Sequence, residues 1–506
     1  MTVGAAALAS ANGALAEVRY RVVELGAALE QAAYHSEFGM EQGRFAINDQ
    51  GIVSGNAVDE AGNPFAMIWF PSADACGVTY PLRIPLTANG LSTTSCDLSE
   101  GIDPVVAGYV GVSHTSSESM AAAWRGAEGW TATLASEMRS AAFSIADDGR
   151  TIFGTCPWEC GVSFSRRGTK WILLTDDAPL AIGSAQRLDS EQSKFSENAA
   201  TTAELLSGAS NLHAAGIGHS YRCTSPYLCH FEDFTQSMCF DAEWGLIFHG
   251  GEPYPIVPHG RWSRCGGGKL DTPRGVAVFA RSLNLLYGHA QGGSLNPFGG
   301  PWPAGCDINS GNCDQCEDYA TVWHSLGSVP IYLGHLPVAS GWEHEASTVQ
   351  GASRVADARA NPADWVETAV GTLTESEQGS VSRRRAVRWQ LSPVTGIWSG
   401  VALDELLEER GLNLTQAHGV NASGWIVATS APNEWEPGFA FVLIPVADSC
   451  VGDIDGDGMV AAADLSVVLG NWGECVAAPC LGDLDCNGVV DASDLASLLG
   501  NWGPCP

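Results

Sequence analysis

The C-terminal tail of this chain, residues 450–506, contains two copies of a sequence repeat with a period of 30 residues. Each copy carries oxygen-bearing side chains at positions 1, 3, 5 and 12, counted from Asp453 and from Asp483, and then an apolar pattern typical of a helix. Ligands at this spacing, with glycine at position 6 where the loop turns most sharply, are the signature of a calcium loop. The repeat therefore predicts two units, each a calcium loop followed by a helix.

The predicted ligands of the two calcium ions are the side chains at positions 1, 3, 5 and 12, the carbonyl group at position 7, and one further carboxylate at position 9. They are Asp453, Asp455, Asp457, Met459 and Asp464 in the first loop, and Asp483, Asp485, Asn487, Val489, Asp491 and Asp494 in the second. Because Ala461 stands at position 9 of the first loop, we expect the second loop to bind calcium more tightly. The alternative is an acidic turn before each helix, in which Asp464 and Asp494 act only near the helix N-terminus.

On these residues the tail resembles a type I dockerin, the EF-hand-like, two-loop module that docks enzymes or binding proteins onto cohesin domains. The resemblance covers residues 450–506 and implies a small α-helical, calcium-binding domain with a cohesin-like partner. In that family, positions 10 and 11 of each loop carry much of the cohesin contact. In this chain those positions are Ala462, Ala463, Ala492 and Ser493.

The charge of the chain excludes some classes of partner. Its 57 acidic residues outnumber its 25 basic residues and give a formal net charge of −32, which opposes binding to phosphate backbones and anionic membranes. We therefore predict no nucleic-acid partner. No stretch is apolar over the length needed to cross a membrane, so we also predict no transmembrane span.

The 16 cysteines, many of them closely spaced, favour an oxidising compartment. In the tail, Cys450 to Cys475 and Cys480 to Cys505 have equal separations, so one disulfide per repeat is our first choice among three connectivities, with Cys486 left over. Residues 1–16 are small and apolar, and we interpret residues 1–18 as the remnant of a signal peptide. Together these features predict a secreted protein, extracellular or at the cell surface.

The body, residues 19–447, is predicted to be mainly β. One sequence pattern predicts two strands around a turn at residues 46–55 and a third strand at residues 65–69. The pattern recurs at 145–154 and at 420–427, with partial copies between them. About seven such copies favour a β-propeller, since one copy cannot bury both faces of its sheet but a closed ring can. Residues 19–25 would complete the last blade near residues 438–446. The alternatives are a β-sandwich or two stacked all-β domains.

The same sequence pattern resembles the HAF-type extracellular repeat. The matching residues are Tyr20, Leu25-Gly26, Ile47-Asn48, Gly51 and Phe65 to Trp69. This resemblance covers most of residues 19–446 and implies secretion and a repeat fold, but no reaction.

The sequence contains no Gly-x-Ser-x-Gly elbow, no His-Glu-x-x-His motif and no phosphate-binding glycine loop. We interpret Glu343-His344-Glu345 as a solvated loop rather than a site. We therefore predict no catalytic or cofactor-binding residue.

Two cysteine clusters and four loop tryptophans are weaker candidates for ligand binding. We interpret the cluster at residues 306–316 as a disulfide-stapled insertion, with zinc or calcium as the alternatives, and the cluster Cys223, Cys229, Cys239 and Cys265 as two staples. The tryptophans that could stack on sugar rings are Trp302, Trp342, Trp365 and Trp435.

The leading functional hypothesis is therefore a secreted, modular, non-enzymatic protein. Its β-propeller body would serve for ligand binding or surface display, and the candidate ligand is a glycan. Its calcium-dependent tail would attach the protein to a partner or assemble it into a complex. The alternative is a carbohydrate-active enzyme of the glycoside hydrolase type that carries a dockerin and acts in polysaccharide breakdown.

Overall fold

A computed structural model describes part of the chain. The described residues are 18–29, 45–60, 64–74, 77–86, 91–111, 119–125, 133–138, 140–146, 149–160, 163–173, 186–187, 200–210, 213–225, 228–241, 245–246, 248–249, 252–253, 278–280, 285–291, 318–323, 331–334, 336, 341–356, 365–377, 381–393, 395–408, 411–431, 437–446, 452–454, 459–475, 482–484 and 488–504. Within them the protein is mainly β, and its two short α-helices lie in the C-terminal tail, as the sequence predicted.

The first half of the body consists of antiparallel units of four strands. They are β2 (Ala46–Ile47), β3 (Val53–Val58), β4 (Pro64–Asp74) and β5 (Gly77–Pro85); β6 (Thr93–Leu98), β7 (Val105–Val110), β8 (Met120–Arg125) and β9 (Thr133–Met138); β10 (Ala141–Ile145), β11 (Thr151–Cys160), β12 (Ser163–Ile172) and β13 (Gln186–Arg187); and β14 (Ala200–Ser210), β15 (His213–Ser225), β16 (Leu228–Asp241) and β17 (Gly245–Leu246).

The second half follows a similar plan after a two-stranded ribbon, β18 (Phe248–His249) with β19 (Glu252–Pro253), but its first two units are joined into one sheet by a parallel pairing of Asp318 with Ala346. The further units are β20 (Val278–Ala280), β21 (Leu285–Gln291), β22 (Asp318–Trp323) and β23 (Ile331–Tyr332); β24 (Trp342–Ala356), β25 (Trp365–Glu377), β26 (Val381–Leu391) and β27 (Trp398–Ala402); and β28 (Gln416–Val420), β29 (Ile426–Ser430) and β30 (Pro437–Val446) with the N-terminal strand β1 (Arg19–Leu29).

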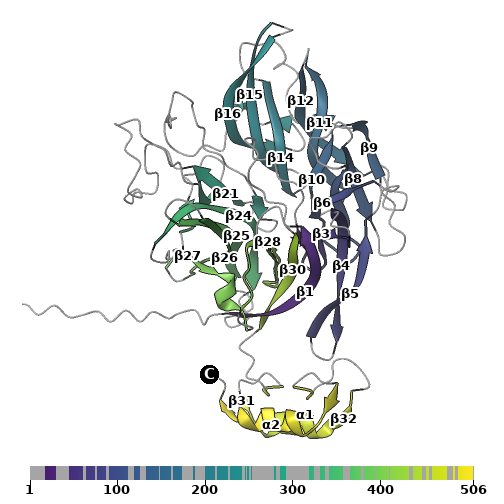
Figure 1. Ribbon diagram of the computed structural model, residues 1–506, viewed down its shortest axis with the longest axis vertical. Coiled ribbons are helices and arrows are strands. Elements are labelled where there is room, and N and C mark those ends of the chain that lie inside the picture. The colour runs from purple at the N-terminus through teal and green to yellow at the C-terminus, as the bar shows by residue number, and fades with distance from the viewer. Residues whose placement is uncertain are drawn as a thin grey trace, which may run out of the picture.

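The N-terminal strand completes the last unit of the body. β1 pairs antiparallel with β30 from Arg19 opposite Val446 to Leu29 opposite Pro437, with one irregularity between Glu24 and Gly26. This confirms the predicted pairing of residues 19–25 with residues 438–446. The two ends of the body are thereby joined by backbone hydrogen bonds between segments far apart in the sequence (Figure 1).

The core lies in layers between successive units. One layer holds Ile68 of β4, Val106 of β7 and Trp124 of β8, and the next holds Ala107 and Trp171. Because each sheet is covered on both faces, its strands carry apolar residues on both sides. Trp69, Trp124 and Trp389 are all fully buried in the core.

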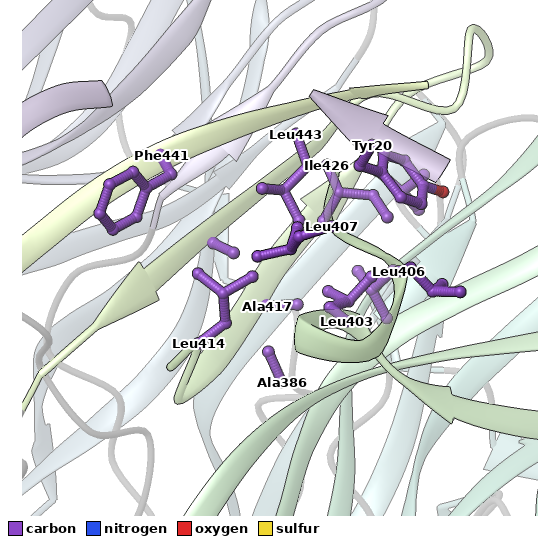
Figure 2. Packing of buried hydrophobic residues seen from close by; sticks show 13 residues of the cluster. Tyr20, Ala386, Leu403, Leu406, Leu407, Leu414, Ala417, Ile426, Phe441 and Leu443 are labelled. Atoms are coloured by element: carbon purple, nitrogen blue, oxygen red, sulfur yellow. The ribbon is translucent and has the colours of Figure 1, made fainter. Parts of the chain in front are cut away.

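Another core layer lies beside the paired strands β1 and β30. It is formed by a short 3-10 helix, η2 (Leu403–Leu406), and by the last unit of the body. Figure 2 shows Leu403, Leu406 and Leu407 facing Leu443 and Ile426, with Tyr20 of β1 at the edge of the cluster. The hydroxyl of Tyr20 accepts a hydrogen bond of 2.9 Å from Nη1 of the buried Arg388 in β26. The closing strand is therefore tied to the preceding unit as well as to β30.

The repeated Asn-x-x-Gly turn forms hydrogen bonds both inside the turn and between units. Asn48 Oδ1 accepts from the N–H groups of Gln50 and Ile52, and Gly51 takes φ +74, a left-handed conformation that favours glycine. The Nδ2 group of Asn48 donates to the carbonyls of Ser99 and Gly101 in the next unit. Asn421, in the last unit of the body, repeats the pattern, and its Nδ2 group donates to the carbonyl of Asn48 in the first unit.

One local prediction was wrong. Glu343 and His344 do not lie in a loop, because residues 342–356 form β24. This strand pairs with β25, with Glu343 opposite Ser376 and His344 opposite Glu375. The backbone hydrogen bonds of β25 therefore decide the conformation of a polar segment that reads as a loop. Glu343 is exposed.

The tail folds as a compact pair of repeats. α1 (Ala462–Gly470) and α2 (Ala492–Gly500) contact each other, and short strands flank them: β31 (Met459–Val460), β32 (Gly473–Glu474), β33 (Val489–Val490) and β34 (Gly503–Pro504). Figure 1 shows this unit in yellow, apart from the sheets of the body. None of the helices in the described part of the chain has the length and apolar character needed to cross a membrane.

Candidate metal centre

The carboxylate at position 12 of each predicted loop ties the two ends of that loop together. Asp464 Oδ1 accepts a hydrogen bond of 2.6 Å from the N–H of Ile454, and its Oδ2 accepts one of 2.8 Å from the N–H of Ala461. In the second repeat, Asp494 accepts from Leu484 at 2.5 Å and from Asp491 at 2.8 Å. Asp464 and Asp494 are both fully buried.

These contacts place Asp464 and Asp494 in the first turn of their helices, where a carboxylate also interacts favourably with the helix dipole. The alternative interpretation of the sequence, an acid that caps a helix, therefore describes part of their role. It does not exhaust that role, because each carboxylate oxygen has a second lone pair that could coordinate a cation.

The position-1 carboxylate of the second loop is also buried. Asp483 is 5% exposed, and its Oδ2 accepts a hydrogen bond of 2.9 Å from the N–H of Gly488, the position-6 glycine, whose φ is +86. The same oxygen lies 3.5 Å from Sγ of Cys475. Cys475 is disulfide-bonded, but its partner lies outside the described residues, so the pairing with Cys450 stays a prediction. Asp453, the equivalent of Asp483, is half-buried.

The two repeats differ at position 9. Asp491 Oδ1 accepts hydrogen bonds from the N–H of Ser493 at 2.7 Å and from the Ser493 hydroxyl at 2.6 Å. Asp491 is thus the N-cap of α2, whereas Ala461 cannot cap α1 with its side chain. The hydroxyl and the backbone N–H of Ser493 hold the pKa of Asp491 below its ordinary value.

Positions 7 and 8 lie in the short strands. Met459 and Val489, whose carbonyls are predicted ligands, open β31 and β33. Val460 and Val490, at position 8, are fully buried with Val468 and Leu498 in the core of the tail. The apolar residue at position 8 therefore holds each loop against the helices.

Four predicted ligands, Asp455, Asp457, Asp485 and Asn487, lie outside the described residues. Within the residues that the structure does describe, no group of three or more His, Cys, Asp or Glu side chains could hold a metal ion. The cysteine cluster at residues 306–316 and the predicted bridges at Cys480 and Cys505 also fall on residues that are not described.

The donor chemistry of the tail nevertheless fits calcium. Every predicted ligand offers oxygen, and the fully buried carboxylates Asp464 and Asp494 belong to a tail whose sequence has ten acidic residues from Asp448 onward and no Lys, Arg or His. Hard divalent cations prefer such oxygen donors. The tail itself thus supplies no cationic side chain to balance its buried carboxylates.

Sequence reasoning missed two glycines that join the repeats. Gly452 and Gly482 precede the position-1 aspartates and take φ +107 and +104. A Cβ atom on Gly452 would stand 3.2 Å from Cα of Leu498, and one on Gly482 would stand 3.1 Å from Cα of Val468. The repeated Gly-Asp pair, 30 residues apart, is the signal that could have identified them.

Of the loop tryptophans proposed to stack on sugars, Trp342 has a described side chain. The guanidinium carbon of Arg383 lies 4.3 Å from its ring centroid, and Arg383 also forms an ion pair with the buried Glu375. One face of the Trp342 ring is therefore covered by a cation. Trp302 and Trp435 lie outside the described residues, as does the side chain of Trp365.

Comparison with known proteins shows distant structural similarity alone. No family model and no curated protein matches the chain. A putative oxidoreductase (glucose dehydrogenase) from Thermus thermophilus is 9% identical, with 84% of this chain and 99% of that chain covered and a TM-score of 0.29. A periplasmic gluconolactonase from Pseudomonas aeruginosa is 11% identical, with 85% and 97% covered and a TM-score of 0.31. The WD40 domain of SCAP from fission yeast is 10% identical, with 85% and 98% covered and a TM-score of 0.30.

These solved structures are β-propeller proteins. No dockerin or HAF family is matched, so both resemblances stay predictions.

Proposed function

We propose that this chain is a secreted, modular, non-enzymatic protein. Its body, residues 19–447, is a β-propeller of about seven blades that serves for binding or display. Its tail, residues 450–506, is a dockerin-like domain that folds around two calcium ions and attaches the body to a partner protein.

The burial of carboxylates in the tail is the observation that carries this proposal. Asp464 and Asp494 are fully buried and Asp483 nearly so, and carboxylate oxygens are the ligands that calcium prefers. Bound calcium takes oxygen ligands from several parts of each loop. Asp464 and Asp494 already accept hydrogen bonds from backbone N–H groups of their own loops, so these two predicted ligands are held in place by the fold.

The proposed blade arrangement is supported by the pairing of strands. Each of the four-stranded units of the body is antiparallel, and successive units pack apolar side chains against one another. The N-terminal strand β1 pairs with β30 and so joins the two ends of the body by backbone hydrogen bonds. The repeated Asn48 and Asn421 turns add hydrogen bonds from unit to unit.

Exposed apolar side chains on the tail support a protein partner. Leu469 and Trp472 are 54% and 50% exposed at the end of α1, and their equivalents Leu499 and Trp502 are 52% and 49% exposed at the end of α2. Exposed large apolar side chains, tryptophan above all, are enriched at sites of protein interaction. A cohesin-like domain is the proposed partner.

Calorimetric titration of the full chain with calcium tests the proposal. We expect two binding events, with affinities in the range of extracellular calcium modules, about 10⁻⁴ to 10⁻³ M or tighter. The double variant Asp453→Ala, Asp483→Ala should lose both. The control is Ser466→Ala, which removes an exposed hydroxyl of α1 that is not a predicted ligand, and it should retain both.

Absence of calcium binding by the wild-type chain would refute the metal assignment. The non-enzymatic assignment of the body is tested separately by incubation with a panel of polysaccharides. Release of soluble sugars would contradict it and would favour the carbohydrate-active enzyme instead.

A further inference from the structure

We propose that the two calcium loops are coupled crosswise: positions 7 and 8 of each loop are held by the chain segment that follows the other repeat's helix. This inference rests on the calcium-binding tail proposed above, and it adds how the two sites communicate. Loop 1 here means residues 453–464 and loop 2 means residues 483–494.

The strand pairings of the tail cross between repeats. β31, which contains positions 7 and 8 of loop 1, pairs with β34 after α2, with Met459 opposite Pro504 and Val460 opposite Gly503. β33, the same part of loop 2, pairs with β32 after α1, with Val490 opposite Gly473. The N–H of Cys475 extends the second pairing to the position-6 carbonyl of Gly488 at 3.0 Å.

The packing contacts of the tail also run from one repeat to the other. Gly452, which leads into loop 1, lies against Leu498 of α2, and Gly482, which leads into loop 2, lies against Val468 of α1. The position-8 valines of both loops share one buried cluster with these two helix residues. Neither repeat therefore contains a complete core of its own.

The crossing has a direct consequence for the metal sites. The predicted carbonyl ligands at Met459 and Val489 lie in the two strands that pair across. A cation that orders loop 1 should also order residues 503–504, and one that orders loop 2 should order residues 473–474. By thermodynamic reciprocity, disturbing either of those segments must weaken calcium binding in the opposite repeat.

Two glycines give a matched pair of variants. Gly473 and Gly503 occupy equivalent positions with φ +115 and +133, and nothing lies within 4 Å of a Cβ atom added to either one. A β-branched residue there is strained without a clash. Gly503→Val should therefore disturb β34, and Gly473→Val should disturb β32, with no direct contact to any predicted ligand.

The test is a calcium titration of each variant in a background with a single remaining site. In Asp483→Ala, which leaves loop 1, Gly503→Val should weaken calcium binding about tenfold and Gly473→Val should have little effect. In Asp453→Ala, which leaves loop 2, the effects should be exchanged. If each glycine variant weakened the loop of its own repeat instead, or both loops equally, the crossed coupling would be wrong.

Hydrogen exchange of the full chain in a buffer with millimolar calcium separates this inference from the proposed function. In that buffer, Gly503→Val should speed amide exchange in residues 459–461 more than in residues 489–491, and Gly473→Val should do the reverse. Failure of the wild type to bind calcium would refute the metal assignment alone. Faster exchange confined to the variant's own repeat would refute the coupling even if both calcium ions bind.

Discussion

At the scale of single residues, the two repeats use the same position for different purposes. Asp491 caps α2 through Ser493, whereas Ala461 leaves the N-terminus of α1 without a side-chain cap. The sequence assigned Asp491 to calcium because of its position in the loop. Its contact with Ser493 accounts for the residue without a metal, and a role as a ligand stays a prediction.

The cap makes the second repeat sensitive to acid. Because the pKa of Asp491 is lowered in the folded state, its stabilising effect is present above the ordinary Asp pKa, near 3.9, and is lost as pH falls through the lowered value. Ser493→Ala removes the first cause of the shift, so the Asp491 pKa should rise toward its ordinary value. NMR titration of the Asp491 carboxyl measures this, and an unchanged pKa would contradict the assignment. Ser466→Ala, an exposed serine of α1, is the control.

At the scale of elements, the turn that opens each repeat of the body is a connector between sheets. Asn48 is fully buried, forms hydrogen bonds within its own turn and donates two to the next unit. The sequence identified this turn from its Asn-x-x-Gly spacing. The bonds to the next unit were not predictable, because they depend on which carbonyls the neighbouring sheet brings within reach.

Removal of the Asn48 side chain should therefore destabilise the body by about 3 kcal/mol, since it leaves several buried backbone groups without partners. Asn421→Ala should cost less, because Asn421 donates a single hydrogen bond to its neighbour. Denaturant unfolding measures both, with Glu60→Ala, an exposed residue of the same unit, as the control. Equal stability of Asn48→Ala and wild type would contradict the connector role.

At the scale of the whole molecule, β1 joins the first and last parts of the body. Its pairing with β30 extends over ten registered positions, and its Tyr20 packs into the core beside η2 (Figure 2). Deletion of residues 1–29 should therefore abolish the cooperative unfolding transition of the body, whereas deletion of residues 1–17 should preserve it. Scanning calorimetry of the two truncated chains distinguishes them. A cooperative transition without β1 would show that the body does not need this closure.

The sequence predicted the mainly β body, the pairing of its N-terminal strand and the two loop-helix units, because these follow from local periodicity and repetition. It misread residues 343–345 as a loop, since their polarity does not reveal the pairing of β24 with β25. It also missed Gly452 and Gly482, whose role depends on contacts with the opposite helix. Local patterns identify elements, while contacts between repeats require the folded structure.

The proposal that the tail folds around two calcium ions is tested most directly by native mass spectrometry of the full chain, which counts bound ions. At millimolar calcium we expect a population with two bound ions, one of which is lost in Asp453→Ala and the other in Asp483→Ala. A wild-type chain with no bound calcium, or bound ions whose number is unchanged in both variants, would contradict the claim.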